Sequence, residues 1–426
     1  MEDNIKSIIT CDLDGKVETF SDGAEKLFGY SKDEVIGKKR VSDFSPGEVV
    51  LGHVINWLKI AVEKGQWEGE TVFLGKDKNE IPSKIKITPT KGKKGEHIGY
   101  CGVTTPLKDK TPEQVRPKIS FFTKIFKWMV IMRLPFLSAT FVPIFAGAAI
   151  TSMLGEPVSW SWLGLTLLGG AFLHIGTNTS NDYFDHRSGT DALNYNYSNE
   201  GLNGGSRSIQ MGLITPKGML TVAIVAFALS AAVGIPLILR SGMQILWLGL
   251  IGFFSGLFYT APPFKFSSRK GMGEFLIGLN FGPLMVAGST LVQTGRLIPE
   301  SFLAGIPIGL LIAAVVYINE FPDHESDKAT GKNTLIVVFG PERARAGYVA
   351  LVASAFISIV IMAINGTLPM LSLIALLAVY FGYTATKILY KYYNNRLLQP
   401  ANWGTIIMHS VTGILLTIGI WFGNSI

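Results

Sequence analysis

The chain has 426 residues, of which 48% are hydrophobic and only 16% are charged, whereas soluble domains carry about 25% charged residues. Together with a mean hydropathy of +0.34, this excludes a wholly soluble protein. The net charge of +7 is found in some nucleic-acid-binding proteins, but we expect no nucleic-acid partner. Membrane topology explains the excess of Lys and Arg, as shown below.

The N-terminal part is the exception to this apolar character. Residues 1–110 are rich in Lys, Glu and Asp and contain no long apolar run, so we expect a soluble α/β domain there. Its stretch 8-IITCDLDGKVETF-20 places Asp-Gly between two strand-like halves, which predicts a hairpin. Only two cysteines occur, Cys11 and Cys101, which indicates a reducing, cytosolic environment and no disulfide framework. Residues 111–125 are expected to be a linker.

The remainder, residues 126–426, consists of repeated apolar runs and predicts an all-α polytopic membrane bundle. We count nine candidate transmembrane helices, at residues 126–152, 158–180, 218–239, 244–261, 273–293, 299–320, 346–365, 367–389 and 403–423. The connections after the even-numbered spans hold most of the Lys and Arg residues, whereas those after spans 1, 3, 5 and 7 hold only Arg240 and Arg296. By the positive-inside rule, the even-numbered ends face the cytoplasm, and the soluble domain lies there too.

Two similar acidic clusters follow even-numbered spans. The stretch 181-NDYFDHRSGTD-191 follows the second span, and 319-NEFPDHESDKATGK-332 follows the sixth. If the second span continues as a helix for another turn, Asp182 and Asp185 lie on one face, as Asp323 and Asp327 do at a spacing of four. A single acidic cluster is usually a solvated loop, but two matched clusters on one side of a membrane predict one shared site.

The residue types in and around the clusters favour a particular ligand. Carboxylate and amide oxygens suit Mg²⁺, which usually completes its shell with water and phosphate oxygens. Cations on the same side of the membrane suit a diphosphate. Each of them can also be explained without a ligand, as an anchor under the positive-inside rule or, for Arg133 in the first span, as a side chain that snorkels to the interface. A diphosphate at a membrane site suggests a polyprenyl diphosphate whose prenyl group passes to an electron-rich acceptor. The candidate ligands besides the four aspartates are Asn178, Asn181, Asn319, Arg133, Arg207, Lys265 and Lys332.

At these residues the chain resembles the UbiA superfamily of intramembrane prenyltransferases, over about residues 120–426. Asn181, Asp182 and Asp185 match the first family motif, N-D-x-x-D-x-x-x-D, but its last position is Gly189 and the acid comes later, at Asp191. That spacing, together with 204-GGSRSIQMGLITP-216, is similar to the menaquinone branch, whose acceptor is 1,4-dihydroxy-2-naphthoate. Close relatives in the superfamily use 4-hydroxybenzoate or glycerophosphate lipids, so these acceptors stay open.

The resemblance also implies roles for individual residues. Mg²⁺ would bridge the diphosphate to the four aspartates, with Arg207 and Lys332 assisting, and Asp191 would be a further ligand or a base that deprotonates the acceptor. The catalytic candidates are therefore Asp182, Asp185, Asp191, Asp323 and Asp327.

Residues 5–108 resemble a PAS domain, through 27-LFGYSKDEVIGK-38 and the paired strands around 75-GKDKNEIPSKI-85. The resemblance implies a cytoplasmic sensory domain that supports a homodimer, and we assign it no cofactor. A membrane transporter or sensor gated by this domain is the alternative class, with the carboxylates as an ion pathway. Transporters place ionisable residues near mid-membrane, however, whereas these cluster at one face.

Overall fold

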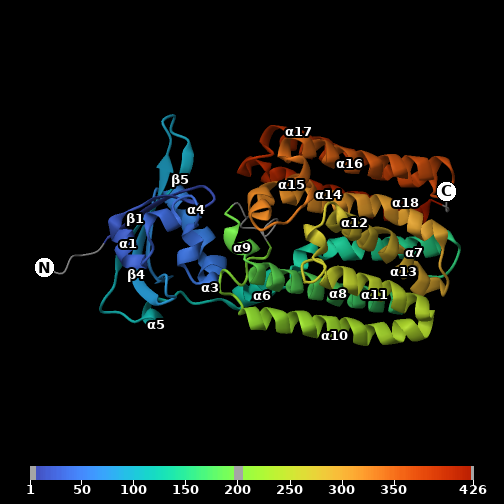
Figure 1. Ribbon diagram of the computed structural model, residues 1–426, viewed down its shortest axis with the longest axis horizontal. Coiled ribbons are helices and arrows are strands. Elements are labelled where there is room, and N and C mark those ends of the chain that lie inside the picture. Colours follow the sequence, from blue (N-terminus) through green and yellow to red (C-terminus); the bar gives the residue numbers. More distant parts are fainter. Residues whose placement is uncertain (1–5, 196–204, 424–426) are drawn as a thin grey trace. The chain divides into compact units, whose positions relative to one another are not determined.

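The computed structural model describes residues 6–195 and 205–423. It divides into two compact units (Figure 1). The first comprises the chain up to Ile131 together with Arg207–Thr215, and the second comprises Met132–Ser206 and the chain from Pro216 onward.

The first unit is built on a five-stranded antiparallel sheet with the strand order β2-β1-β5-β4-β3. The predicted hairpin is confirmed, because β1 and β2 are paired and joined by a turn in which Gly15 has a φ of 78°. The Asp12 side chain stabilises this turn by accepting hydrogen bonds from the backbone N–H groups of Asp14 and Lys16. The strands are β1 Ser7–Asp12, β2 Val17–Phe20, β3 Trp67–Leu74, β4 Glu80–Lys91 and β5 His97–Pro106.

The helices of the sheet domain lie between β2 and β3 rather than alternating with every strand. Antiparallel neighbours need only short turns between them, so no helical crossover is required elsewhere. Phe28 at the end of the first helix packs on Phe44, with ring centroids 4.9 Å apart, and this contact ties the helical segment to the sheet core. The helices are α1 Asp22–Phe28, α2 Lys32–Val35, the short helix Val41–Phe44, α3 Gly47–Val49, the turn of π-helix Val50–Val54 and α4 Ile55–Lys64.

The segment after the sheet contains two helices, α5 Pro112–Val115 and α6 Phe121–Ile131. The predicted first span is wrong at its start, since the helix that is long and apolar enough to cross a membrane begins at Leu134 rather than at residue 126. Arg133 has a left-handed φ of 51° and Pro135 follows it, so the helix is interrupted there. The apolar run from residue 126 is therefore divided between the two units.

The second unit is helical throughout its described residues, as predicted (Figure 1). Among the described residues, seven helices are long and apolar enough to cross a membrane: Leu134–Met153 (α7 with the turn before it), α10 Pro216–Ser241, Met272–Thr294 (α12 and α13), α14 Pro299–Ala329, α16 Pro341–Ile364, Met370–Tyr392 (ending in α17) and α18 Gln399–Phe422. The other two predicted spans fall on α8 Trp160–Ser188, which is not among the seven, and on α11 Met243–Leu257, whose 15 residues are fewer than the roughly 20 of a usual span. The shorter helices are α9 Thr190–Leu193, Phe266–Ser268, α15 Leu335–Phe339 and Arg396–Leu398.

Helix α14 lies unusually close to the helix Met272–Thr294 because glycines face each other across the contact. A Cβ atom added at Gly282 would lie 2.4 Å from the carbonyl oxygen of Gly305, and one added at Gly309 would lie 2.2 Å from that of Gly278. Each helix thus contributes a pair of small residues four positions apart, a pattern that brings membrane helices into backbone contact.

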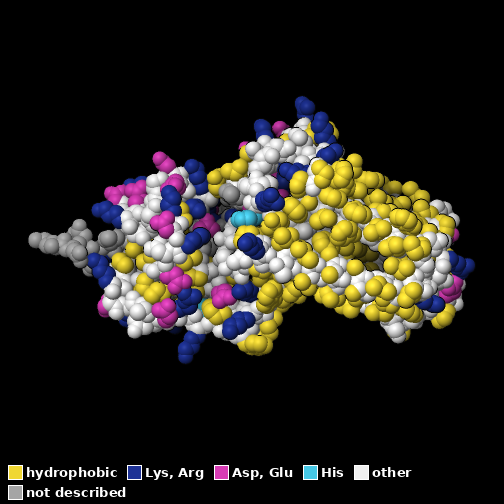
Figure 2. Space-filling view, turned by 60° about the horizontal axis from the view of Figure 1, so that its bottom comes forward, with side chains coloured by type: hydrophobic (Ala, Val, Ile, Leu, Met, Phe, Trp, Pro, Cys, Tyr) yellow, Lys and Arg dark blue, Asp and Glu magenta, His cyan; other side chains and the backbone are white. Residues whose placement is uncertain are grey.

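Hydrophobic side chains cover the outer face of the helical unit in Figure 2, whereas charged side chains concentrate on the sheet-containing unit. Leu239, Ile364 and Leu377 are each more than 70% exposed. Such a surface is typical of helices that contact lipid rather than water.

Candidate functional site

Both acidic clusters lie on the last turns of long helices. Helix α8 runs to Ser188 and so carries Asp182 and Asp185 on one face. Helix α14 runs to Ala329, through Pro322, and carries Asp323 and Asp327 in the same way. We predicted that the second span continues as a helix through Asp182 and Asp185, and this is confirmed.

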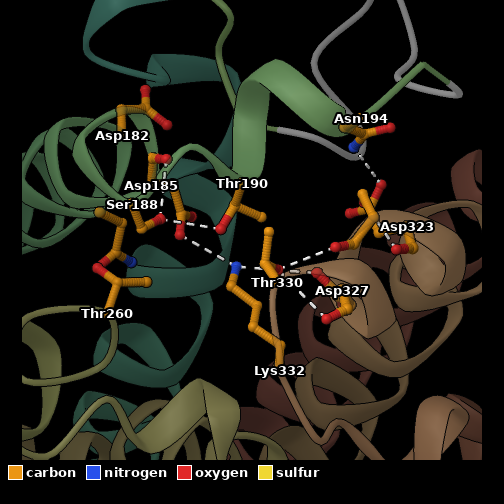
Figure 3. A network of polar contacts seen from close by, with 12 residues as sticks. Asp182, Asp185, Ser188, Thr190, Asn194, Thr260, Asp323, Asp327, Thr330 and Lys332 are labelled. Carbon is orange, nitrogen blue, oxygen red and sulfur yellow. Dashed lines mark hydrogen bonds and ion pairs between the residues drawn. The ribbon is translucent and has the colours of Figure 1, made fainter.

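Lys332 lies between the two clusters (Figure 3). Its Nζ atom is 3.0 Å from Oδ1 of Asp185 on α8 and 3.9 Å from Oδ1 of Asp327 on α14. Burial lowers the pKa of this lysine, but the nearby Asp185 and Asp327 carboxylates outweigh burial and raise the pKa above its usual range. A permanently charged ammonium group therefore joins the two carboxylate clusters.

Asp182 is bound by a second cation. Nη2 of Arg133 is 2.6 Å from Oδ1 of Asp182, and Nη1 donates to Oδ1 of Asn178 at 3.3 Å. The backbone N–H of Ser206 donates to the same Asp182 oxygen at 3.3 Å. The other oxygen of Asp182, Oδ2, is buried and has no hydrogen-bond partner among the described residues. Arg133 lies just before the membrane span, where its left-handed backbone interrupts the helix. This interruption allows the Arg133 side chain to reach Asp182.

Three further residues lie at the site: Asp191 and Asn194, from α9 and its C-terminal end, and Gly205. Asp191 is buried, and a Cβ atom built on Gly205 would lie 2.9 Å from Asp182 Oδ1 and 3.8 Å from Asp191 Oδ1. Asp191 and Asp182 therefore flank the same glycine. Asn194 Nδ2 donates to Asp323 Oδ1 at 2.8 Å, so this turn also contacts the second cluster (Figure 3).

The other four predicted ligands do not join the contacts between the two clusters described above. Oδ1 of Asn181 accepts a hydrogen bond from Thr260, and Oδ1 of Asn319 accepts one from Asn402 on α18. The Lys265 side chain is exposed on the loop before Phe266–Ser268. Arg207 directly follows Ser206 but groups with the first unit. Gly204, which opens the predicted glycine-rich stretch, lies outside the described residues.

Sequence reasoning missed three contributors, Asn194, Gly205 and Ser206. The Gly-Gly pair at residues 204 and 205 was a usable signal, because paired glycines mark close backbone approach. Asn194 carried no such signal. It lies in a polar segment, and the sequence does not show which of its side chains contacts Asp323.

The four aspartates offer a cation carboxylate oxygen atoms, which suit Mg²⁺. Among the residues that the structure describes, Oδ2 of Asp182 is buried and has no partner, so it is available as a ligand. Across residues 6–195 and 205–423, however, no three His, Cys, Asp or Glu side chains are close enough together to hold a metal by themselves. The donors thus fit Mg²⁺ that takes its other ligands from water and a diphosphate, as this ion commonly does.

The sequence model of the UbiA prenyltransferase family matches residues 140–406. The 1,4-dihydroxy-2-naphthoate octaprenyltransferase of Bacillus subtilis is 28% identical over 54% of this chain and 71% of its own length. The enzyme of the same name from Escherichia coli is 30% identical over 54% of this chain and 74% of its own length. The human UbiA prenyltransferase domain-containing protein 1 is 26% identical over 57% of this chain and 69% of its own length.

Solved structures also resemble the chain. A UbiA homologue from Aeropyrum pernix aligns with a TM-score of 0.51 and 14% identity, over 66% of this chain and 97% of that protein. A UbiA homologue from Archaeoglobus fulgidus bound to DMAPP and Mg²⁺ aligns with a TM-score of 0.48 and 20% identity, over 68% and 99%. At such identities the Aeropyrum likeness concerns the fold alone.

The N-terminal unit is matched separately, by the sequence model of a PAS domain over residues 5–105. The membrane part is matched over more than half of the chain, and its helices are long and apolar enough to cross a bilayer several times. The chain is therefore a multi-pass membrane protein with an N-terminal PAS domain, and it belongs to the UbiA prenyltransferase family.

Proposed function

We propose that this chain transfers a polyprenyl group from an allylic polyprenyl diphosphate to 1,4-dihydroxy-2-naphthoate, as a step of menaquinone biosynthesis. The observation that carries the proposal is the meeting of two carboxylate clusters, from α8 and α14, around the Lys332 ammonium group. A site of alternating anionic and cationic groups at the end of an apolar bundle suits a lipid with a diphosphate head.

The diphosphate end of the substrate is assigned to the four aspartates. Asp182, Asp185, Asp323 and Asp327 would hold Mg²⁺, which neutralises charge on the departing diphosphate when it is bound. Oδ2 of Asp182, which has no partner in the described part of the chain, is oriented for this role because Arg133 and the Ser206 N–H hold Oδ1 in place. Such positioning keeps the carboxylate in one geometry before the substrate arrives.

The cations are assigned to the phosphate oxygens. Lys332 is the central one, since its ammonium donates to Asp185 and has donor capacity left for a ligand. Arg133 holds Asp182 and Asn178, and Arg207 and Lys265 are proposed to approach the diphosphate from their loops. Asn178, Asn181 and Asn319 are proposed to border the diphosphate rather than to bind the metal, because each has a protein partner.

The acceptor is inferred from the relatives' names. The Bacillus and Escherichia proteins are named for 1,4-dihydroxy-2-naphthoate. We propose that the allylic carbon–oxygen bond breaks, so that diphosphate leaves, and that the naphthoate ring attacks the resulting carbocation. The ring then loses its carboxylate as CO₂ as it gains the prenyl group. Asp191, buried beside Gly205 and near Asp182, is proposed as the ligand or base next to the acceptor.

The placement in the membrane is proposed as nine spans, with α8 and α11 counted beside the seven apolar helices. The excess of Lys and Arg in the connections after even-numbered spans supports a site and a PAS domain that face the cytoplasm. We propose residues 1–110 as a sensory domain that supports a homodimer, 111–125 as a linker and 126–426 as the prenyltransferase domain. Unchanged activity, assembly and redox response after deletion of residues 1–110 would refute the sensory role.

The acceptor is tested by product analysis. Membranes containing the full chain would receive Mg²⁺, a polyprenyl diphosphate and one of three acceptors: 1,4-dihydroxy-2-naphthoate, 4-hydroxybenzoate or a glycerophosphate. We expect mass spectrometry to find a prenylated, decarboxylated naphthoquinol only with the first. A prenylated product with another acceptor, and none with the naphthoate, would refute the assignment.

A further inference from the structure

Helix α6 Phe121–Ile131 presents an apolar surface that the described residues leave largely exposed at its start and 44–45% exposed further along. Apart from Lys124, its exposed residues are aromatic or aliphatic, and the exposed fractions reach 72% at Phe121 and 80% at Phe122. At 100° per residue they form one continuous arc along the helix. The arc consists of Phe121, Phe122, Ile125, Phe126 and Trp128.

The opposite side of α6 packs on the PAS domain. Thr123 lies against Gly52, where an added Cβ atom would be 3.1 Å from its side chain. Lys127 Nζ is 2.8 Å from Oε1 of Glu48, and Ile131 is fully buried. The exposed arc is therefore not the face by which this helix joins its own unit.

The distance along the chain limits what the arc can contact. Only Met132 and Arg133 separate α6 from the span that begins at Leu134. Three Cα–Cα steps cover at most about 11 Å, so the end of α6 cannot lie far from the membrane surface. With 11 residues the helix is too short to cross a bilayer.

The composition of the helix matches that position. Trp side chains sit favourably at the level of the lipid headgroups, and Phe is common on the apolar face of helices that lie in the membrane interface. Lys118 and Lys124 are exposed beside the arc, and anionic lipid headgroups attract such cations. A helix with apolar and basic sides of this kind lies in the plane of the interface.

We propose that α6 is an interfacial helix, with the arc from Phe121 to Trp128 inserted at the headgroup–acyl boundary of the bilayer that holds the membrane domain. The PAS domain is then attached to the membrane surface by the face of α6 that carries Thr123 and Lys127. This attachment does not depend on the acceptor or on the reaction.

The test uses spin labels on the full chain in lipid nanodiscs that contain phosphatidylglycerol. Cys11 and Cys101 are replaced by Ser, and a single label is placed by Phe122→Cys or, as the matched control, by Lys124→Cys on the same helix. The quantity measured is the ratio of collision rates with oxygen, which prefers lipid, to those with a water-soluble nickel chelate. We expect this ratio to be severalfold higher at position 122 than at 124.

Equal, water-like ratios at both positions would overturn the proposal. Low accessibility of the label at position 122 to both reagents would overturn it too, because the arc would then be covered by protein, such as a second copy of the chain. The diphosphate-release activity of each labelled protein shows that the chain is folded.

Discussion

At the scale of single residues, Lys332 is the group on which the site depends. It connects carboxylates from two helices that are otherwise held apart by their own repulsion. Buried charges left without a partner are costly, so its removal is expected to affect both the local structure and the proposed binding of the diphosphate.

Replacing this lysine with a neutral side chain of similar length tests its role. A charge-assisted hydrogen bond contributes about 1.5–3 kcal/mol, so Lys332→Met is expected to lower kcat/KM for the diphosphate substrate by about 10- to 100-fold. The control is Lys328→Met, an exposed lysine near the end of α14. Equal activity of the two variants in a diphosphate-release assay would contradict the role of Lys332.

The cysteines of the PAS domain give a second test at this scale. Burial raises the pKa of the Cys11 thiol from 9.0 to about 12, so its thiolate population falls about a thousandfold at neutral pH. Cys11 is therefore expected to resist maleimide between pH 7 and 9 until the domain is unfolded in urea. Reaction of native Cys11 as fast as a free thiol, monitored in a Cys101→Ser variant, would show that this strand is not packed as described.

At the scale of secondary-structure elements, much of the site was predictable. Spacings of three and four residues place both carboxylates of each cluster on one helical face, and both helices do continue through the clusters. The interruption at Arg133 was not predictable from hydropathy, because the apolar run passes through it. Its positive φ is coupled to a partner, Asp182, that lies 49 positions away in the chain.

The direction in which Asn319 points shows the same limit. Its position beside the second acidic cluster predicts a role at the site, yet its side chain contacts Asn402. Which side of α14 faces α18 depends on how closely α14 packs against the helix before it, through Gly282 and Gly305. Both glycine pairs are visible in the sequence, but the helix that each one contacts is a tertiary property.

Gly205, which lies beside Asp182 and Arg133, provides the prediction at the element scale. Gly205 has a φ of 76°, and an added methyl group would be 2.9 Å from Asp182 Oδ1 and 3.1 Å from Arg133 Nη2. Gly205→Ala is expected to displace this ion pair, at a cost of about 1–3 kcal/mol, and to lower activity by about tenfold or more.

Gly212→Ala is its matched control. Gly212 also has a positive φ, of 69°, but nothing lies within 4 Å of an added Cβ atom there. Backbone strain is thus common to both variants, and contact with the ion pair occurs in only one. Equal losses of diphosphate release in the two variants would mean that strain alone accounts for the effect.

At the scale of the whole molecule, the proposed orientation makes a simple prediction. An epitope tag at the N-terminus is expected to be protected from added protease in spheroplasts and cleaved in inverted membrane vesicles. A tag inserted after Ser241, between α10 and α11, is expected to behave in the opposite way. The reverse pattern for both tags would place the PAS domain and the two acidic clusters outside the cytoplasm.

The central claim is that two acidic clusters, far apart in the sequence, form one diphosphate site. The most direct measurement is the rate of diphosphate release as a function of Mg²⁺ concentration for Asp182→Ala and Asp323→Ala. Glu325→Ala, an exposed acid on α14, is the control.

Removal of a preorganised electrostatic group costs about a hundredfold or more in rate. We expect that loss in both aspartate variants, no loss in the control, and no release by the unaltered chain with a chelator. Release by Asp323→Ala at the unaltered rate would contradict the claim, because the second cluster would then lie outside the site.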